Sequence, residues 1–254
     1  MPNTDISPIS VTFLGTNGWY SSDTGNTLCI LVDTPDTLII LDAGDGFHKI
    51  PDLYPYVDKP AVLFISHLHL DHISGLHTLA RCKFENGLKI YCLPGNKKYL
   101  TEFIGYPYTV PISELSYNLT IEELPVGMSN LPFPVKTALL EHTQPVYGYW
   151  FDIGMKIAFC TDTGPCQGII DLGSGTDLLI TECSYLPGLE NPGWPHMNPE
   201  TAISYAIKTG TKRLALVHFA ADLYTSLKQR EKIEEEYSNH AGLIVGRDDL
   251  KILL

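Results

Sequence analysis

The sequence is short of positive charge. It has 254 residues, of which 17 are lysine or arginine and 29 are aspartate or glutamate, so its formal net charge is −12 at pH 7. Long nucleic acids are bound through stripes of lysine and arginine, so this balance argues against a long polyphosphate as the partner. Divalent cations bound in a site would make the local charge positive, so a small anion could still bind there. A small substrate therefore fits the charge better than a large one.

The sequence also lacks long apolar runs. No segment approaches the roughly 18 residues of a membrane span, and the start MPNTDISPISVTF has neither the basic nor the apolar region of a signal peptide. No glycine- and serine-rich linker or block of like charge marks a boundary between domains. We therefore expect one domain over residues 1–254, located in the cytoplasm and away from membranes.

Cysteine pairs at Cys-x-x-Cys spacing are absent. The six cysteines are scattered along the chain, and four of them lie within or beside apolar or β-branched runs. A free cysteine in such a run behaves as a small buried hydrophobic residue. We therefore expect reduced thiols in the core rather than a disulfide framework or a cysteine metal site.

Histidine and aspartate are concentrated in one short segment, SHLHLDH, which contains His67, His69, Asp71 and His72. It directly follows the apolar run 61–65, a predicted buried strand. Alternating His-x-His at the end of a strand places two imidazoles on one face, and imidazole with carboxylate suits zinc, manganese or iron. The segment therefore predicts a metal site rather than a polar loop with some histidine enrichment, but it does not name the reaction.

Four later apolar segments repeat this design. We predict strands over 135–140, 156–160, 177–180 and 213–217, and each ends in a polar residue of the kind that binds metals. In chain order these strand ends contain His142, Asp162, Glu182 and His218. The repetition indicates that the ends converge on one edge, where loops of α/β proteins carry their chemistry.

Two further residues admit two interpretations each. Asp42 follows the predicted strand 37–41 and is either a carboxylate that supports the metal loop or part of an ordinary Asp-Gly turn. His196 lies just before a predicted helix that has Asn198 as its N-cap, Pro199 at its first position and an end near residue 208. A helix start favours anions, yet position alone is more typical of a surface loop histidine.

Apolar spacing predicts three more helices. They cover residues 73–82, 96–104 and 225–239, the last being strongly charged and solvated over most of its surface. His77 falls on the first of them as a surface residue rather than a ligand.

Taken together, the His-x-His-x-Asp-His motif and the later His, Asp and His resemble the metallo-β-lactamase superfamily over nearly the whole chain. The resemblance implies an α/β fold, the four-layer αββα sandwich, with a dinuclear site at one edge of the sheets. It implies zinc as the metal, with manganese and iron as alternatives, and it makes Asp42 a supporting residue. The implied ligands are His67, His69 and His142 for one metal, Asp71, His72 and His218 for the other, and Asp162 between them.

Within the superfamily, the ribonuclease Z and cyclic phosphodiesterase branch is the most similar. His196 precedes Asn-Pro-Glu-Thr-Ala and lies 22 residues before His218, and the branch uses a histidine there to contact or protonate the phosphate. Only 20 residues separate His142 from Asp162, which leaves no room for the arm with which ribonuclease Z grips transfer RNA. The resemblance therefore favours the armless relatives that hydrolyse small or cyclic phosphodiesters.

The resulting expectation is a metal-dependent phosphodiesterase in which a hydroxide between two metals attacks phosphorus, with Asp71 and His196 as catalytic residues. The alternatives are a ribonuclease Z-like RNA endonuclease, a lactone or thioester hydrolase on the same site, and a non-hydrolytic di-iron protein. The expected partner is a small phosphodiester, and a homodimer is left open because relatives are commonly dimers. Tyr185, Trp194 and Tyr224 either stack on a base or pack in the core.

Overall fold

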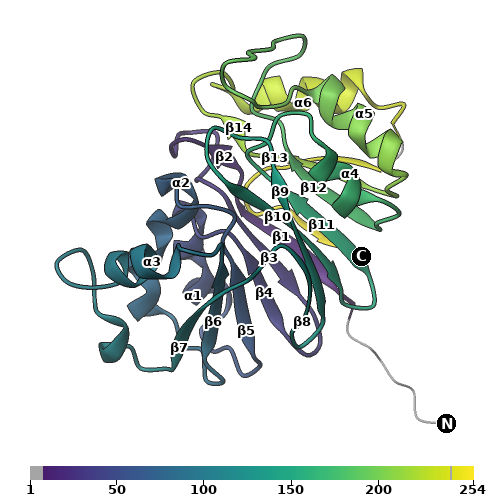
Figure 1. Ribbon diagram of the computed structural model, residues 1–254. Coiled ribbons are helices and arrows are strands. Elements are labelled where there is room, and N and C mark those ends of the chain that lie inside the picture. The colour runs from purple at the N-terminus through teal and green to yellow at the C-terminus, as the bar shows by residue number, and fades with distance from the viewer. Residues whose placement is uncertain (1–7, 241) are drawn as a thin grey trace.

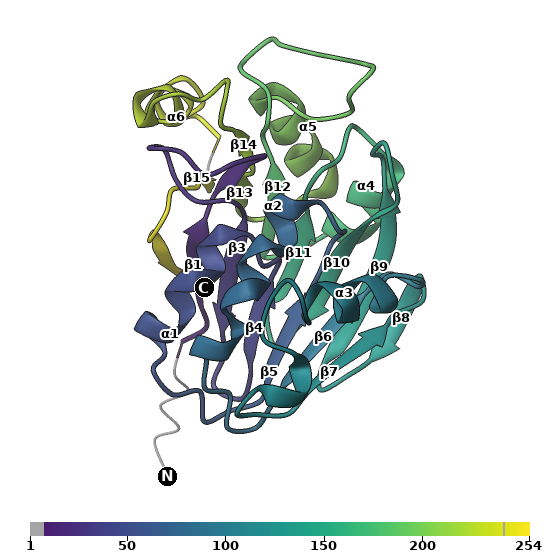
Figure 2. The same cartoon turned by 90° about the vertical axis from the view of Figure 1, so that its left-hand side faces the viewer.

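Two seven-stranded β-sheets lie face to face at the centre of the molecule, and helices cover the outer face of each (Figure 1). This arrangement comes from a computed structural model, which describes residues 8–240 and 242–254. Figure 2 shows the helices α1, α2 and α3 in front of the first sheet. The predicted four-layer αββα sandwich, the metallo-β-lactamase fold, is confirmed.

The first sheet has the strand order β16-β1-β3-β4-β5-β6-β7. Strands β4 to β7 are parallel, so their carboxyl ends meet at one edge of the sheet. The strands are β1 (Ser10–Gly15), β3 (Cys29–Asp33), β4 (Leu38–Leu41), β5 (Ala61–Phe64), β6 (Leu88–Cys92), β7 (Leu119–Glu123) and β16 (Lys251–Leu253).

The second sheet has the strand order β15-β13-β12-β11-β10-β9-β8. Strands β11, β12, β13 and β15 are parallel, while β9 and β11 both run antiparallel to β10, so β9 ends at the same edge as β11 to β13. The strands are β8 (Gly127–Asn130), β9 (Pro134–Leu140), β10 (Val146–Asp152), β11 (Lys156–Cys160), β12 (Leu178–Glu182), β13 (Leu214–Val217) and β15 (Leu243–Val245).

A short parallel ribbon connects parts of the chain that are far apart in sequence. Strand β2 (Asn17–Gly18) pairs with β14 (Phe219–Ala220), so the loop after β1 lies beside the residue that follows β13. The ribbon places His218 next to the N-terminal part of the chain.

The helices form the outer layers. On the first sheet lie η1 (Asp45–Lys49), α1 (Ile50–Leu53), α2 (Leu70–Ile73), η2 (Ser74–Arg81), α3 (Lys97–Phe103) and η3 (Ile112–Glu114). On the second lie α4 (Gln167–Gly173), α5 (Pro199–Thr209) and α6 (Leu227–Glu236). No helix in the described part of the chain is long and apolar enough to span a membrane.

Three buried apolar layers hold the sandwich together: one between the sheets and one between each sheet and its helices. Strands such as LIIL and AVLF are apolar at every position because both of their faces are covered. Between the sheets, the ring of Phe64 lies 5.1 Å from that of Tyr149 and 4.8 Å from that of Phe151. All six cysteines are free, and five of them are buried.

The structure differs from the predicted elements in one region and adds several others. Residues 73–82 are not an α-helix, because α2 ends at Ile73 and a 3₁₀ segment follows. Gly75 packs there so closely that a Cβ atom would lie 2.2 Å from the Gly44 carbonyl oxygen, so the turn is set by tertiary contact. Strand β10 and helix α4 were not predicted, and both contain glycines that weaken the local pattern: Gly148 in the strand and Gly168 and Gly173 in the helix.

Candidate metal centre

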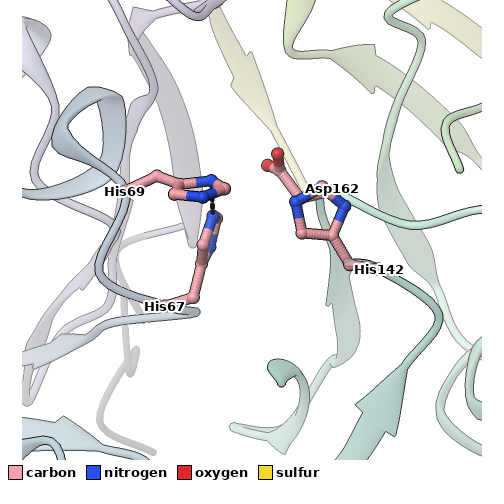
Figure 3. A group of neighbouring side chains, drawn as sticks. All are labelled: His67, His69, His142 and Asp162. Atoms are coloured by element: carbon pink, nitrogen blue, oxygen red, sulfur yellow. Dashed lines mark hydrogen bonds between the residues drawn. The ribbon is translucent and has the colours of Figure 1, made fainter. Parts of the chain in front are cut away.

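Seven histidine and aspartate side chains gather at the edge where strands of both sheets end. They form two groups, and a third group joins Asp162 and His218 to His196; within each group the candidate ligand atoms lie within 4.8 Å of one another. The first group is His67, His69, His142 and Asp162, and the second is Asp71, His72 and His218. Figure 3 shows His67 and His69 meeting His142 and Asp162, which come from the other half of the chain. The structure therefore brings together all seven ligands that the sequence predicts.

The parallel strands explain this convergence. The segment SHLHLDH leaves β5 at the carboxyl edge of the first sheet, and its last residues form the short helix α2. His142, Asp162 and His218 follow β9, β11 and β13, which end at the same edge of the second sheet. His77 lies outside the group, exposed, with Nδ1 2.7 Å from the Ser74 carbonyl oxygen.

The side chains fit metal ions better than they fit one another. Both ring nitrogens of His142 are buried and have no hydrogen-bond partner among the described residues. His67 Nε2 lies 2.8 Å from His69 Nδ1, and His72 Nε2 lies 3.3 Å from His218 Nε2. Buried polar atoms are nearly always paired. Imidazole nitrogens that lie against other imidazole nitrogens, or that have no partner, are therefore typical of a site that binds cations.

Hydrogen bonds on the other side of the rings hold several of these histidines in place. Asp42 accepts hydrogen bonds from the Ser66 backbone N–H at 2.7 Å and the Ser66 hydroxyl at 2.8 Å, and its carboxylate lies 2.7 Å from His72 Nδ1. The Ser184 hydroxyl lies 3.0 Å from His218 Nδ1. A partner of this kind sets the orientation and tautomer of a ligating imidazole. The Asp42 carboxylate thus contacts two residues of the segment SHLHLDH, Ser66 and His72.

The backbone around the cluster is strained. Among the described residues, five that are not glycine have positive φ, and four of them are Trp19 (71°), Asp42 (55°), Asp162 (48°) and His218 (55°). Side chains rarely adopt this left-handed conformation, and it persists where the surrounding structure imposes it. The concentration of strain here marks the cluster as the functional region.

Burial and charge set the protonation of the cluster. Burial lowers the pKa of His67 and His142, which keeps these imidazoles neutral and able to bind metal. Burial opposes ionisation of Asp162, but His218 and His72 outweigh it and hold the pKa of that carboxyl well below its usual range. The cluster therefore offers neutral nitrogens and ionised oxygens.

His196 lies beside the cluster with a carboxylate behind it. Its Nδ1 is 2.7 Å from Glu182 Oε1, and Glu182 is completely buried at the end of β12. Burial alone would lower the pKa of His196, but Glu182 outweighs this and raises the pKa to about 9. The ring of His196 stands 5.3 Å from that of His142 and 5.9 Å from that of His218. Glu182 thus holds the Nδ1 side of the His196 ring, and the ring lies beside the metal cluster.

Glu182 has a positioning role that the sequence did not reveal. It also accepts backbone hydrogen bonds from Ser184 and Met197, both at 3.2 Å, so it connects the end of β12 to the segment before α5. The only signal in the sequence was its place at the end of a predicted strand.

A cavity of about 630 Å³ opens above the cluster. Among the aromatic side chains near it, Trp19 is 69 % exposed and Trp194 is 47 % exposed, and both line the cavity. Tyr185 also lines it but is mostly buried, and its hydroxyl donates to the Trp194 carbonyl oxygen at 2.6 Å. Tyr224 is completely buried and packs against Phe219, so of the two interpretations of Tyr224 the structure supports core packing.

Comparisons with known proteins agree with this geometry. The family model described as "Beta-lactamase superfamily domain" matches residues 37–219. Ribonuclease Z of Nostoc sp. strain PCC 7120 is 25 % identical over 274 aligned positions, which cover 84 % of this chain and 84 % of that protein. The alignment is longer than this chain, so the relative contains segments that this chain lacks.

Two solved structures share the fold. The metallo-beta-lactamase fold protein YhfI from Bacillus subtilis superposes with a TM-score of 0.77 at 20 % identity, covering 98 % of this chain and 100 % of that one. A diphosphatase of the PhnP family superposes with a TM-score of 0.70 at 19 % identity, covering 96 % and 97 %. At these identities the structures establish the fold alone.

Proposed function

Because the chain belongs to the beta-lactamase superfamily and is a metal-dependent hydrolase of that fold, we propose that it hydrolyses a small or cyclic phosphodiester. The observation that carries the proposal is the pair of His196 and Glu182 beside the metal cluster, in which Glu182 raises the pKa of His196. A cation there suits the negative charge of a phosphodiester in its transition state.

We assign two divalent metals to the cluster, with zinc as the expected ion because imidazole and carboxylate are its common ligands. His67, His69 and His142 would hold one metal, Asp71, His72 and His218 the other, and Asp162 would reach both. The Oδ2 atom of Asp162 lies 2.9 Å from His72 Nε2 and 3.1 Å from His218 Nε2, so this oxygen is already at the centre of the cluster. When bound, such metals supply Lewis acidity that activates water and neutralises phosphoryl oxygens.

The residues of the chain then have distinct roles. Glu182 and Ser184 fix His196 and His218, while Asp42 and Ser66 fix His72. As water adds to phosphorus and the bond to the leaving oxygen breaks, His196 gives a proton to that oxygen. An acyl substrate does not carry the anionic phosphoryl group that this cation matches, which favours phosphodiesters over lactones and thioesters.

The shape of the chain favours a small substrate over transfer RNA. The interval between His142 and Asp162 is taken up by β10 and β11, which pair with each other and with β9. No arm extends from this interval, and the relative from Nostoc contains segments that this chain lacks. The net charge of −12 adds repulsion against a long polyphosphate.

The test is a substrate screen with metal analysis of the same samples. We expect the zinc-loaded protein to hydrolyse bis(p-nitrophenyl) phosphate and cyclic phosphodiesters faster than a lactone, a thioester or precursor transfer RNA. We expect His196→Ala to retain both metals by elemental analysis while its turnover falls by about 10²- to 10⁴-fold, the usual contribution of a general acid.

Two outcomes would count against the proposal. Normal phosphodiester turnover by His196→Ala would remove the assigned role of that residue. A wild-type protein that cleaves the thioester or the lactone faster than every phosphodiester would exclude the substrate class.

A further inference from the structure

We propose that Trp19 and Trp194 determine specificity by holding a planar, uncharged aromatic group, such as a nucleobase, attached to the phosphodiester. The proposal rests on the proposed function, because it names which phosphodiesters the site selects. Both rings line the cavity above the metal cluster and both are exposed, which is uncommon for the largest apolar side chain.

Trp19 is anchored to the second metal group. Its backbone N–H donates to Asp71 Oδ2 at 2.7 Å, and the neighbouring Gly18 packs so closely that a Cβ atom would lie 2.5 Å from the ring of His218. Its φ of 71° turns the backbone out of the strand β2. The edge of its ring also contacts Tyr20, with the centroids 5.4 Å apart. The backbone that carries the indole is therefore held by the cluster itself.

The loop that carries Trp19 is held from behind by a buried cation. Arg230 of α6 is 2 % exposed, donates to the Thr16 hydroxyl at 2.9 Å and also donates to the side-chain oxygen of Asn17. Its guanidinium lies 4.4 Å from the centroid of the Phe219 ring, beside β14. A rigid support of this kind lets a side chain bind a ligand at low cost in conformational entropy.

Trp194 is anchored to the first metal group. Its ring meets that of His142 edge to face at a centroid distance of 5.9 Å, and it lies 6.3 Å from the ring of His196. Its carbonyl oxygen accepts the hydrogen bond from Tyr185. The two tryptophans thus come from separate loops that line one cavity, Trp19 bonded through its backbone to Asp71 and Trp194 packed through its ring against His142.

The charge of the cavity limits what the indoles can hold. None of the described residues that line it is a lysine or an arginine, and the exposed carboxylate of Asp222 lies at its wall. The positive charge of the bound metals would balance a phosphodiester. A second phosphate elsewhere in the cavity would have no lysine or arginine to balance its charge. The substrate therefore carries one phosphate and a neutral aromatic group, for which stacking is the available attraction.

A matched pair of substrates tests this inference. Adenosine 2′,3′-cyclic phosphate and glycerol 1,2-cyclic phosphate contain the same five-membered cyclic phosphodiester, but only the first carries a base. We expect the zinc-loaded wild type to prefer the adenosine compound by about tenfold to a hundredfold in kcat/KM, measured by phosphorus NMR, since one stacked base contributes on that scale.

Variants of the two tryptophans distinguish a loss of stacking on the base from a general loss of activity. Trp19→Ala and Trp194→Ala are expected to raise KM for the adenosine compound about tenfold, and to lower kcat/KM for the adenosine compound more than for the glycerol compound, so that the preference between the two falls. Trp19→Phe and Trp194→Phe should retain most of the preference. Tyr106→Ala removes a ring that is 88 % exposed and outside the cavity, and it should change neither substrate.

A binding measurement makes the result independent of turnover. Calorimetric titration of the zinc-loaded wild type should show adenosine 5′-monophosphate binding at least tenfold tighter than ribose 5-phosphate, with the difference lost in both alanine variants. Equal affinity for the two ligands, or equal loss on both cyclic substrates, would overturn the role of the tryptophans. Hydrolysis of neither cyclic phosphate would instead refute the proposed function, and the titration would still decide the role of the tryptophans.

Discussion

At the scale of single residues, the metal cluster is maintained at a cost in backbone energy. Asp42, Asp162 and His218 are all held in the left-handed region, where each residue that is not glycine costs on the order of 1–3 kcal/mol. Glycine would relieve this cost but would remove the carboxylate or imidazole. Other contacts must therefore offset the strain, such as the two hydrogen bonds that Asp42 accepts from Ser66.

Asp177 illustrates a residue that acts on stability rather than chemistry. Its carboxylate accepts hydrogen bonds from Lys212 Nζ at 2.7 Å and from the Lys156 backbone N–H at 2.8 Å, just before β12. The bond from Lys212 is the largest cause of a lowered pKa. Since the folded pKa lies below that of the unfolded chain, near 3.9, the stabilisation is present above about pH 4 and is lost as the pH falls through the folded value.

We therefore expect Asp177→Asn to lower the free energy of unfolding at pH 7 by up to about 1 kcal/mol, since a partly exposed pair is screened by water. The difference from wild type should shrink as urea titrations move from pH 7 to pH 3. Lys212→Gln removes the partner and should reproduce part of the effect. Curves for Asp177→Asn and wild type that stay equally separated at every pH would contradict this account.

At the scale of elements, the start of α5 connects stability to the site. Asn198 is the N-cap: its Oδ1 accepts from the Thr201 backbone N–H at 2.9 Å, and its Nδ2 donates to the Leu189 carbonyl oxygen at 3.1 Å. Pro199 follows as the first helical residue. The sequence predicted both the cap and the helix, and the loop that this cap holds also carries Trp194 and His196.

Two substitutions of Asn198 distinguish the contributions of its two hydrogen bonds to stability. Asn198→Ala loses both, and we expect it to cost about 1 kcal/mol, or a Tm lower by about 2–4 °C for a chain of this size. Asn198→Asp keeps the acceptor for Thr201 and loses only the donor to Leu189, so its Tm should stay near that of wild type. Thermal scans by circular dichroism measure both variants, and equal Tm values for Asn198→Ala and wild type would show that the cap does not stabilise the helix.

At the scale of the whole molecule, the metal cluster joins the two halves of the sandwich. His67 and His69 follow a strand of the first sheet, while His142 and Asp162 follow strands of the second. Ions bound between them would bind the folded chain and not the unfolded one, and would therefore stabilise the whole fold.

Removal of the metals should accordingly lower thermal stability. At a free metal concentration 100 times Kd, binding contributes about 2.7 kcal/mol, so we expect EDTA to lower Tm by about 5–10 °C and zinc to restore it. Differential scanning fluorimetry with added EDTA, then excess zinc, measures this. A Tm that does not respond to either would exclude metals held between the sheets.

His142→Ala provides the control, because its two buried ring nitrogens have no partner without metal. In the presence of EDTA we expect this variant to be at least as stable as wild type, since removing an unpaired buried polar group removes its desolvation penalty. Added zinc should raise the Tm of this variant by less than it raises the Tm of wild type. An equal rise in Tm would show that His142 is not a ligand.

The sequence by itself determined the superfamily, the four-layer fold and the kind of residue at the site. The superfamily and its fold follow from the resemblance of the His-x-His-x-Asp-His motif and the later ligand-type residues to that family. The strands and the convergence of their ends follow from local features: apolar runs, and ligand-type residues placed directly at strand ends. The ligand roles of His67, His69, Asp71, His72, His142, Asp162 and His218 stay predictions, as does a single domain over residues 1–254, but the parallel strands bring all seven side chains to one place.

Only the tertiary structure decided how the site is completed. Trp19 meets Asp71 across 52 residues of sequence, Arg230 supports Asn17 across 213, and Glu182 meets His196 through a loop with no regular pattern. The 3₁₀ turn over 74–81 likewise results from the close packing of Gly75 against Gly44. Such contacts depend on how distant segments pack, and neither residue periodicity nor spacing records that. The sequence could therefore predict the candidate ligands, while the residues that contact His196 and line the cavity became visible only in the folded chain.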